Sequence, residues 1–257
     1  MKRPKFLILL TNDDGIKAEG LKVLHRELLP LGEVFVFAPK DEKSGASHSF
    51  SLRQPLEVVW LDRRTASVDG TPTDCVMLAV RGLLKRKPDL VVSGLNQGPN
   101  LGDDVTYSGT VAGAIEGTLL GIPSISVSVT SWNHCRFDLA AKFTAQLVRL
   151  IKKNGLPKNT LLNVNVPNLP KKKIKGVKIT RLGKRIYRDV IIEKAGEEGK
   201  KLYIIDGEDP GWEKEENTDF AAIENNSISI TPFHLDLTNY GAIKILKVWE
   251  KELNHEF

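Results

Sequence analysis

The sequence predicts an α/β fold: a three-layer, Rossmann-like, mostly parallel sheet with a protruding β-hairpin and a C-terminal helical extension. Apolar runs of strand length alternate with segments of helical periodicity through the first two thirds of the chain. Such alternation indicates parallel strands joined by helices, with both faces of the sheet covered. At 257 residues and 41% hydrophobic content, the chain is long enough to bury a full core.

The elements follow from apolar spacing and from the residues that start and stop them. A helix begins at Thr71, because Thr71 can cap it, Pro72 suits the first turn, and Asp74 completes an approximate capping box. A strand over 89–93 is expected to end at Gly94. The other expected strands are 6–10, 33–39, 56–61, 66–68, 122–129 and 161–166, and the expected helices are 18–29, 71–85, 108–120 and 138–152.

The last quarter of the chain departs from this alternation. Residues 186–193 and 201–206 are strand-like and flank a turn at 195–199, which predicts a protruding hairpin. A strand at 227–231 and an amphipathic helix at 241–253 follow. We therefore expect a single domain, 1–257, with a core over 1–183, a hairpin over 184–208 and a C-terminal extension over 209–257.

Composition narrows the classes of function and partner. The net charge of +5 is modest and suits an anionic substrate. The densest basic run, Lys171–Lys173 with Lys175, has no interleaved aromatic residue, so a solvated connector is favoured over a nucleic-acid patch. No apolar stretch is long enough to span a bilayer, and no signal peptide is recognisable. Two isolated cysteines, Cys75 and Cys135, indicate a reducing cytoplasm. We expect neither a nucleic-acid nor a membrane partner.

The segment LTNDDGI, residues 10–16, places polar residues at the end of the first expected strand. Open α/β sheets bind ligands at the carboxyl ends of their strands. The adjacent carboxylates of Asp13 and Asp14 repel each other unless a cation lies between them, and oxygen ligands favour Mg, Mn or Ca. A polar loop that caps the next helix is an equally good interpretation of these residues alone.

A second loop, residues 93–110, follows the strand at 89–93 and precedes a helix. Its four glycines let the backbone approach a ligand, and Ser108-Gly109-Thr110 would open the helix that follows. Free N–H groups and two hydroxyls there would hold a phosphate. The loop lacks the Walker ending and the dinucleotide glycine spacing. A capped glycine loop without a ligand is the simpler alternative. Tyr107 could stack on a base or only pack.

A third loop, residues 40–51, follows the strand at 33–39 and is rich in hydroxyl groups. It can supply a metal ligand or a phosphate donor. His48 could act as a general acid or base, because histidine titrates near neutrality. A hydrogen-bonding role behind the site is slightly favoured for His48.

Five blocks resemble the signatures of the SurE family: LTNDDGI, APKDEKSGASHS, DGTPTDCV, SGLNQGPNLGDDVTYSGTVAGA and SITPFHLDLT. They occur in the family's order and cover nearly the whole chain. The resemblance implies a metal-dependent phosphatase of nucleoside monophosphates, a 5′/3′-nucleotidase, with short polyphosphate as a second substrate. It also implies a cytoplasmic homodimer with exchanged C-terminal elements, which can become a tetramer through the hairpin.

The resemblance also implies the site residues. One divalent ion per subunit, Mg, Mn or Ca, would be held by Asp13, Asp14, Ser44 and Asn96. The phosphate would lie against Asn12, Asn96, Ser108, Gly109 and Thr110. The metal would polarise the phosphate while a water attacks in line, with Asp13, Asp14 and Asp104 as the catalytic carboxylates. Asp104 would orient or deprotonate that water, unless it is merely an exposed loop carboxylate.

Several alternatives remain open at this point. Attack by Asp13 itself, through a phosphoaspartate, is a competing mechanism, although the spacing of aspartyl phosphatases is missing. A non-catalytic nucleotide sensor would use the same phosphate-binding segment, Ser108-Gly109-Thr110 (the phosphate cradle), without needing an open metal site. A nucleic-acid-binding protein would bind with steep salt dependence. A metal-dependent nucleoside hydrolase would leave the phosphate cradle unexplained.

Overall fold

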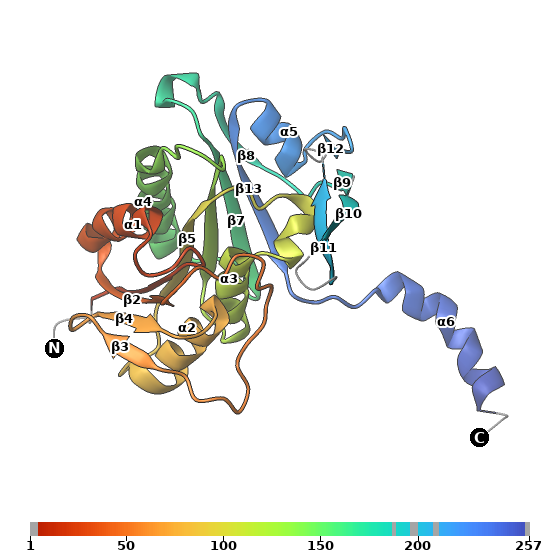
Figure 1. Ribbon diagram of the computed structural model, residues 1–257, viewed down its shortest axis with the longest axis horizontal. Helices are drawn as coiled ribbons and strands as arrows, with labels where there is room; N and C mark the ends of the chain where they lie inside the picture. Colours follow the sequence, from red (N-terminus) through yellow and green to blue (C-terminus); the bar gives the residue numbers. More distant parts are fainter. Residues whose placement is uncertain (1–4, 187–188, 196–199, 208–210, 255–257) are drawn as a thin grey trace.

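The computed structural model describes residues 5–186, 189–195, 200–207 and 211–254. A nine-stranded sheet runs through its centre in the order β3-β4-β2-β1-β5-β6-β7-β13-β8, with helices on both faces (Figure 1). Neighbours pair in parallel except β3 with β4 and β13 with β7. The predicted α/β class with a mostly parallel sheet is therefore confirmed.

The strands of this sheet are short and mostly buried. Their bounds are β1 Leu7–Thr11, β2 Glu33–Pro39, β3 Val58–Trp60, β4 Thr65–Val68, β5 Leu90–Gln97, β6 Ser124–Thr130, β7 Thr160–Pro167, β8 Gly176–Ile179 and β13 Ser227–His234. The helices are α1 Glu19–Leu28, α2 Pro72–Leu78, α3 Gly109–Leu119, α4 Phe137–Asn154, α5 Asp219–Glu224 and α6 Tyr240–Leu253. Short 3₁₀ turns lie at Leu29–Leu31, Gly102–Thr106 and Lys171–Lys173.

Two hydrophobic clusters form the core, one on each face of the sheet. On one face, Ile8 and Leu10 of β1 pack with α1 and α4. On the other face, Leu9 packs with Cys75 and Val76 of α2, and α3 lies beside α2 against β5 and β6. Because side chains alternate along a strand, a continuous apolar run in β1 serves both layers.

Three details differ from the sequence prediction. β5 does not end at Gly94: it continues to Gln97, because after a register shift Asn96 and Gln97 pair with Ser128 and Val129 of β6. Asn96 is consequently held in a strand and not in a loop. The helix begun at Thr71 has the capping box, but it is α-helical only to Leu78 and continues as one π-helical turn, Ala79–Leu83.

The hairpin region is also more divided than the sequence indicates. β10 (Asp189–Ala195) pairs with β11 (Lys201–Gly207), as predicted, but Ile186 belongs to β9 (Arg185–Ile186), which pairs with β12 (Gly211–Trp212). Residues 196–199 of the predicted turn lie outside the described residues. Neither α5 nor β8 was predicted, since both are short and lack a clear period.

The C-terminal helix α6 confirms the predicted helix at 241–253 and extends away from the body of the molecule (Figure 1). Large apolar side chains along it are exposed: Ile243, Ile245, Leu246, Val248, Trp249 and Leu253. The hairpin β10–β11 likewise exposes Ile191, Leu202, Tyr203 and Ile205. In the described parts of the chain, no helix is both long enough and apolar enough to cross a bilayer.

Candidate functional site

The predicted site residues gather where the strand order reverses. The chain passes from β1 to β2 on one side, whereas β5 lies on the other side of β1. The carboxyl ends of β1 and β5 therefore open onto a crevice, the usual ligand position in open α/β sheets. Asn12, Asp13 and Asp14 follow β1 directly, and Asn96 and Gln97 end β5. The N-terminus of α3 lies against Asp13.

Asp13 is buried against the first turn of α3. The Thr110 hydroxyl donates a hydrogen bond to Asp13 Oδ1, and the backbone of Thr110 also stabilises the carboxylate. A Cβ atom on Gly109 would lie 2.9 Å from Asp13 Cβ and 3.0 Å from its Oδ2, so only glycine permits this contact. Burial nevertheless raises the pKa of Asp13, because the loss of water outweighs these hydrogen bonds.

Asp14 lies beside Asp13 and lines a cavity of about 340 Å³. The backbone N–H of Gln97 donates to Asp14 Oδ2 at 3.3 Å. Burial, followed by repulsion from Asp13, raises the pKa of Asp14 to about 7. Two adjacent carboxylates in this environment gain from a positive charge placed between them, as the sequence suggested.

The loop after β2 reaches this cavity. Ser44 lines it, and its hydroxyl donates to Glu42 Oε1 at 2.7 Å, while the N–H of Lys43 donates to the carbonyl of Asp13 at 2.8 Å. Glu42 raises the pKa of both Asp13 and Asp14 through its charge. It is a third carboxylate that the sequence analysis missed, since an exposed glutamate in a charged loop carries no distinguishing signal.

The two asparagines come from the ends of β1 and β5. Asn12 donates through Nδ2 to the carbonyl of Gly15 at 3.0 Å, while its buried Oδ1 has no hydrogen-bond partner within the described structure. Asn96 donates through Nδ2 to the carbonyl of Gly98 at 2.8 Å. Asn12 is therefore bonded to the loop that follows β1 and Asn96 to the residue that follows β5, with an unsatisfied acceptor at Asn12.

Ser108 is the N-cap of α3, and its Oγ accepts a hydrogen bond from the N–H of Val111 at 3.1 Å. The predicted segment Ser108-Gly109-Thr110 thus does open a helix, and it does so next to Asp13. The N-terminal end of this 11-residue helix is suited to negative charge. Asp13 already shares that environment.

Two predicted residues lie apart from this cluster. Asp104 pairs with Arg185 and lines a different cavity, so it is not the exposed loop carboxylate that the sequence left open. His48 contacts the buried Glu116 of α3 at 2.9 Å, which gives it the hydrogen-bonding position rather than one beside the aspartates. Tyr107 is exposed, and its carbonyl accepts from the N–H of Ser47.

Buried polar residues below the glycine loop were also missed. The N–H of Asn100 donates to Asn165 Oδ1 at 2.9 Å, and Asn163 and Asn165 both donate to the carbonyl of Asn100 at 2.8 Å. Asp219 of α5 accepts from the N–H groups of Gly102 and Gly183, each at 2.8 Å. Asparagines inside a buried strand, as in LLNVNVP, were the only available signal.

The donors at the crevice are oxygens of two carboxylates, a hydroxyl and amides. No group of three or more His, Cys, Asp and Glu side chains close enough to hold a metal occurs among the described residues. A hard divalent cation, which keeps several waters and accepts neutral oxygen ligands, fits this donor set better than a thiolate- or imidazole-bound metal.

Comparison with known proteins identifies the family of this chain. The model of the family described as "Survival protein SurE" matches residues 8–189. The chain is 48% identical over 244 residues to a protein of Geotalea daltonii named 5′-nucleotidase SurE, covering 95% of this chain and 98% of that protein. A Coxiella burnetii protein of the same name is 46% identical over 250 residues, with 97% of each chain covered.

A solved structure gives the same result in three dimensions. The crystal structure of the SurE protein from Aquifex aeolicus superposes with a TM-score of 0.86 at 46% identity, covering 95% of this chain and 99% of that one. Sequence and structure therefore agree over almost the entire length, and the chain belongs to the SurE family.

Proposed function

We propose that this protein is a metal-dependent phosphomonoesterase that hydrolyses nucleoside monophosphates to nucleoside and phosphate. The observation that carries the proposal is the contact of buried Asp13 with the first turn of α3, which places a carboxylate pair and a helix N-terminus in one crevice. The relatives named 5′-nucleotidase support the nucleotide as substrate. Short-chain polyphosphate is a second substrate under the same proposal.

Asp13, Asp14, Ser44 and Asn96 would hold one divalent ion, Mg, Mn or Ca. The fit rests on the donor chemistry and on the environment of the two aspartates, in which burial, followed by repulsion from Asp13, raises the pKa of Asp14 to about 7. When bound, such an ion supplies Lewis-acid polarisation of a phosphate oxygen.

The residues of this chain bind and orient the phosphate. Ser108, Gly109 and Thr110 offer hydroxyls and N–H groups at the start of α3, and Asn12 and Asn96 flank them. A water oxygen forms the new bond to phosphorus in line with the ester bond that breaks, and the nucleoside oxygen leaves with a proton. The role of Asp104 in orienting this water stays a prediction. The carboxylate of Asp104 is paired with Arg185.

We also propose a homodimer through α6, and a tetramer through the hairpin β10–β11. Both segments expose apolar side chains that a single chain leaves uncovered, including Ile245 and Trp249 on α6 and Ile205 on β11. Burying them against a second copy removes apolar surface from water.

The test is phosphate release from a panel of nucleoside monophosphates, with Mn or Mg, with EDTA, and with Asp13→Asn. We expect metal-dependent release that EDTA abolishes and that Asp13→Asn lowers by more than about a hundredfold. Asp69→Asn, an exposed aspartate in the turn before α2, is the matched control and should release phosphate at the wild-type rate.

Each contrary result removes a different part of the proposal. Metal-loaded, folded protein that releases no phosphate from any nucleotide would leave the nucleotide sensor as the better function. Release that survives EDTA would remove the metal, and full activity in Asp13→Asn would remove the site assignment.

A further inference from the structure

A second cavity of about 500 Å³ lies next to the crevice just described. Trp132 lines both this cavity and the smaller one at Asp14, so it forms a wall that the two share. The ring of Trp132 lies directly on the backbone of Gly98, where a Cβ atom would be 2.3 Å from the ring. The six-membered part of this indole is therefore anchored, although 65% of the residue is exposed.

The walls of the second cavity are mainly apolar and aromatic. Trp212 of β12 lines it and stacks on Phe220 of α5, with ring centroids 5.2 Å apart and planes at 6°. Leu101 and Ile223 contribute aliphatic surface. The polar groups come from Asp104 with its partner Arg185, from Thr130 and from Glu224. A volume of this size, largely apolar with a few polar groups, is typical of a small-molecule site.

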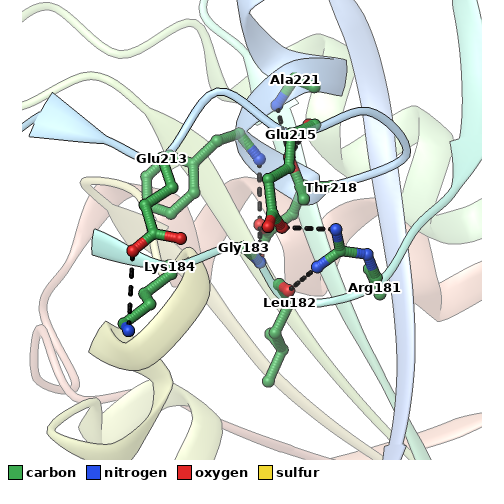
Figure 2. Close-up of polar contacts among 10 residues, drawn as sticks. Arg181, Leu182, Gly183, Lys184, Glu213, Glu215, Thr218 and Ala221 are labelled. Atoms are coloured by element: carbon green, nitrogen blue, oxygen red, sulfur yellow. Dashed lines mark hydrogen bonds and ion pairs between the residues drawn. The ribbon is translucent and has the colours of Figure 1, made fainter. Parts of the chain in front are cut away.

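Polar contacts join the chain segments that follow Arg181 and Trp212, and Figure 2 shows them. Lys184 pairs with Glu213 at 3.6 Å, and the N–H of Glu213 donates to the carbonyl of Lys184 at 2.9 Å. Arg181 pairs with Glu215 in the same view. Together with the pairing of β9 and β12, in which Trp212 lies opposite Arg185, these contacts connect the two segments that carry this wall.

Asp219 joins this wall to the glycine loop. One of its carboxylate oxygens accepts from Gly102 and the other from Gly183, so a single side chain connects the two segments that border the cavity. The loop fixed in this way runs from Asn96 beside Asp14 to Ser108 at the phosphate cradle.

We propose that this second cavity binds the base of the nucleoside monophosphate, with Trp212 and Trp132 as its stacking surfaces. The inference rests on the proposed function, since it places the base of the substrate whose phosphate lies at Asp13 and Ser108. Trp132 lines both this cavity and the one at Asp14, and the glycine loop runs from Asn96 to Ser108, so under this proposal one nucleotide extends from the phosphate position into this cavity. Every base presents a π-face, so aromatic stacking binds bases with little dependence on their identity. Base preference is accordingly broad.

The experiment compares two phosphomonoesters that differ in the base alone: AMP and ribose 5-phosphate. In Trp212→Leu we expect kcat/KM for AMP to fall about tenfold, which is the usual cost of one lost stacking partner, with KM carrying the change. The value for ribose 5-phosphate should stay within about twofold. Trp212→Phe keeps an aromatic ring and should restore most of the activity toward AMP.

Trp60→Leu is the matched control. Trp60 lies in the edge strand β3 and packs edge-on against Phe37 of β2. It lines neither cavity. Equal losses on AMP and ribose 5-phosphate in Trp212→Leu would overturn the proposal, because they would mean a general effect on the cradle. No loss on either substrate would also overturn it.

A measurement on the wild-type protein covers the case in which Trp212→Leu does not fold. Adenosine should inhibit ribose 5-phosphate hydrolysis competitively, while ribose should not, and equal inhibition by the two would contradict a base site. If wild-type protein hydrolyses neither ester, the proposed function fails by itself. The cavity is then judged by tryptophan fluorescence: quenching by adenosine supports it, and no quenching overturns it.

Discussion

The carboxyl edge of the parallel sheet and the C-terminal extension follow opposite rules of burial. At the sheet edge, polar side chains such as Asp13, Asn100 and Asn165 are buried and hydrogen-bonded inside one chain. Along α6, apolar side chains such as Ile245 and Trp249 face outward, 71% and 59% exposed. The first region forms its hydrogen bonds within one chain, whereas the second exposes an apolar surface that the chain does not cover, so disrupting each should have a different consequence.

The largest effect is expected from the double change Ile245→Asp/Trp249→Asp. Charges on this face oppose burial against a second copy, and each lost apolar side chain is worth about 2 kcal/mol. We expect the dimer dissociation constant to rise about a thousandfold or more, measured by sedimentation equilibrium. Lys247→Ser on the same helix is the control. An unchanged oligomeric state would show that α6 is not the interface.

Gly109→Ala tests the opposite region without changing charge or oligomeric state. The added methyl group would lie 2.9 Å from Asp13 Cβ and 3.2 Å from the Lys43 carbonyl, so Asp13 must move. Displacement of a reacting group by a fraction of an ångström to one ångström costs about a hundredfold in kcat/KM. Phosphate release provides the measurement. Gly82→Ala, which has open space around its Cβ position, should be active, and equal activity of both variants would refute close packing at Asp13.

Asn165→Leu addresses the polar network beneath the glycine loop. The change leaves the buried N–H of Asn100 without its 2.9 Å acceptor, so we expect a loss of about 2 kcal/mol in the free energy of unfolding. Denaturant titration measures it. Asn225→Leu, which removes an exposed hydrogen bond at the end of α5, should cost well under 1 kcal/mol (~0.5). Similar losses in the two variants would mean that the network contributes no special stability.

The smallest effect concerns pH and metal. Because the folded-state pKa of Asp14 is raised to about 7, the contribution of this group to the stability of the metal-free protein is fully present below the ordinary pKa near 3.8 and is lost as pH rises through about 7. A divalent ion requires the ionised carboxylates, so stabilisation by Mn²⁺ should grow from pH 5 to pH 8. We expect the increase in Tm to reach a few degrees at pH 8. A Tm increase independent of pH would argue against binding at Asp14.

The sequence analysis succeeded best where a pattern is local. The capping box at Thr71, the helix start at Ser108 and the buried strands around β1 each depend on a few adjacent residues, and all were found. It failed at Gly94, which was predicted to end a strand. In the structure, β5 continues to Gln97 because it pairs with β6. Pairing with a distant strand cannot be read from the composition of the strand itself.

The candidate site shows the same division. Asp13, Asp14 and the Ser108–Thr110 segment were identified, and the structure brings them together at one crevice. Glu42, Trp132 and Asp219 were missed, because their part depends on where the loops and α5 fold back. The prediction of one domain over 1–257, with its core, hairpin and extension, stays a prediction.

By itself, the sequence determined the class of fold, the position of the carboxylate pair after the first strand and the helix start that faces it. These follow from periodicity and from preferences of single residues, which act over a few positions. Only the tertiary structure decided that Asp104 pairs with Arg185, that His48 pairs with Glu116 and that Trp132 lines two neighbouring cavities. Such contacts join residues that lie far apart along the chain, and their energies exist only once the sheet has brought its loops to one edge.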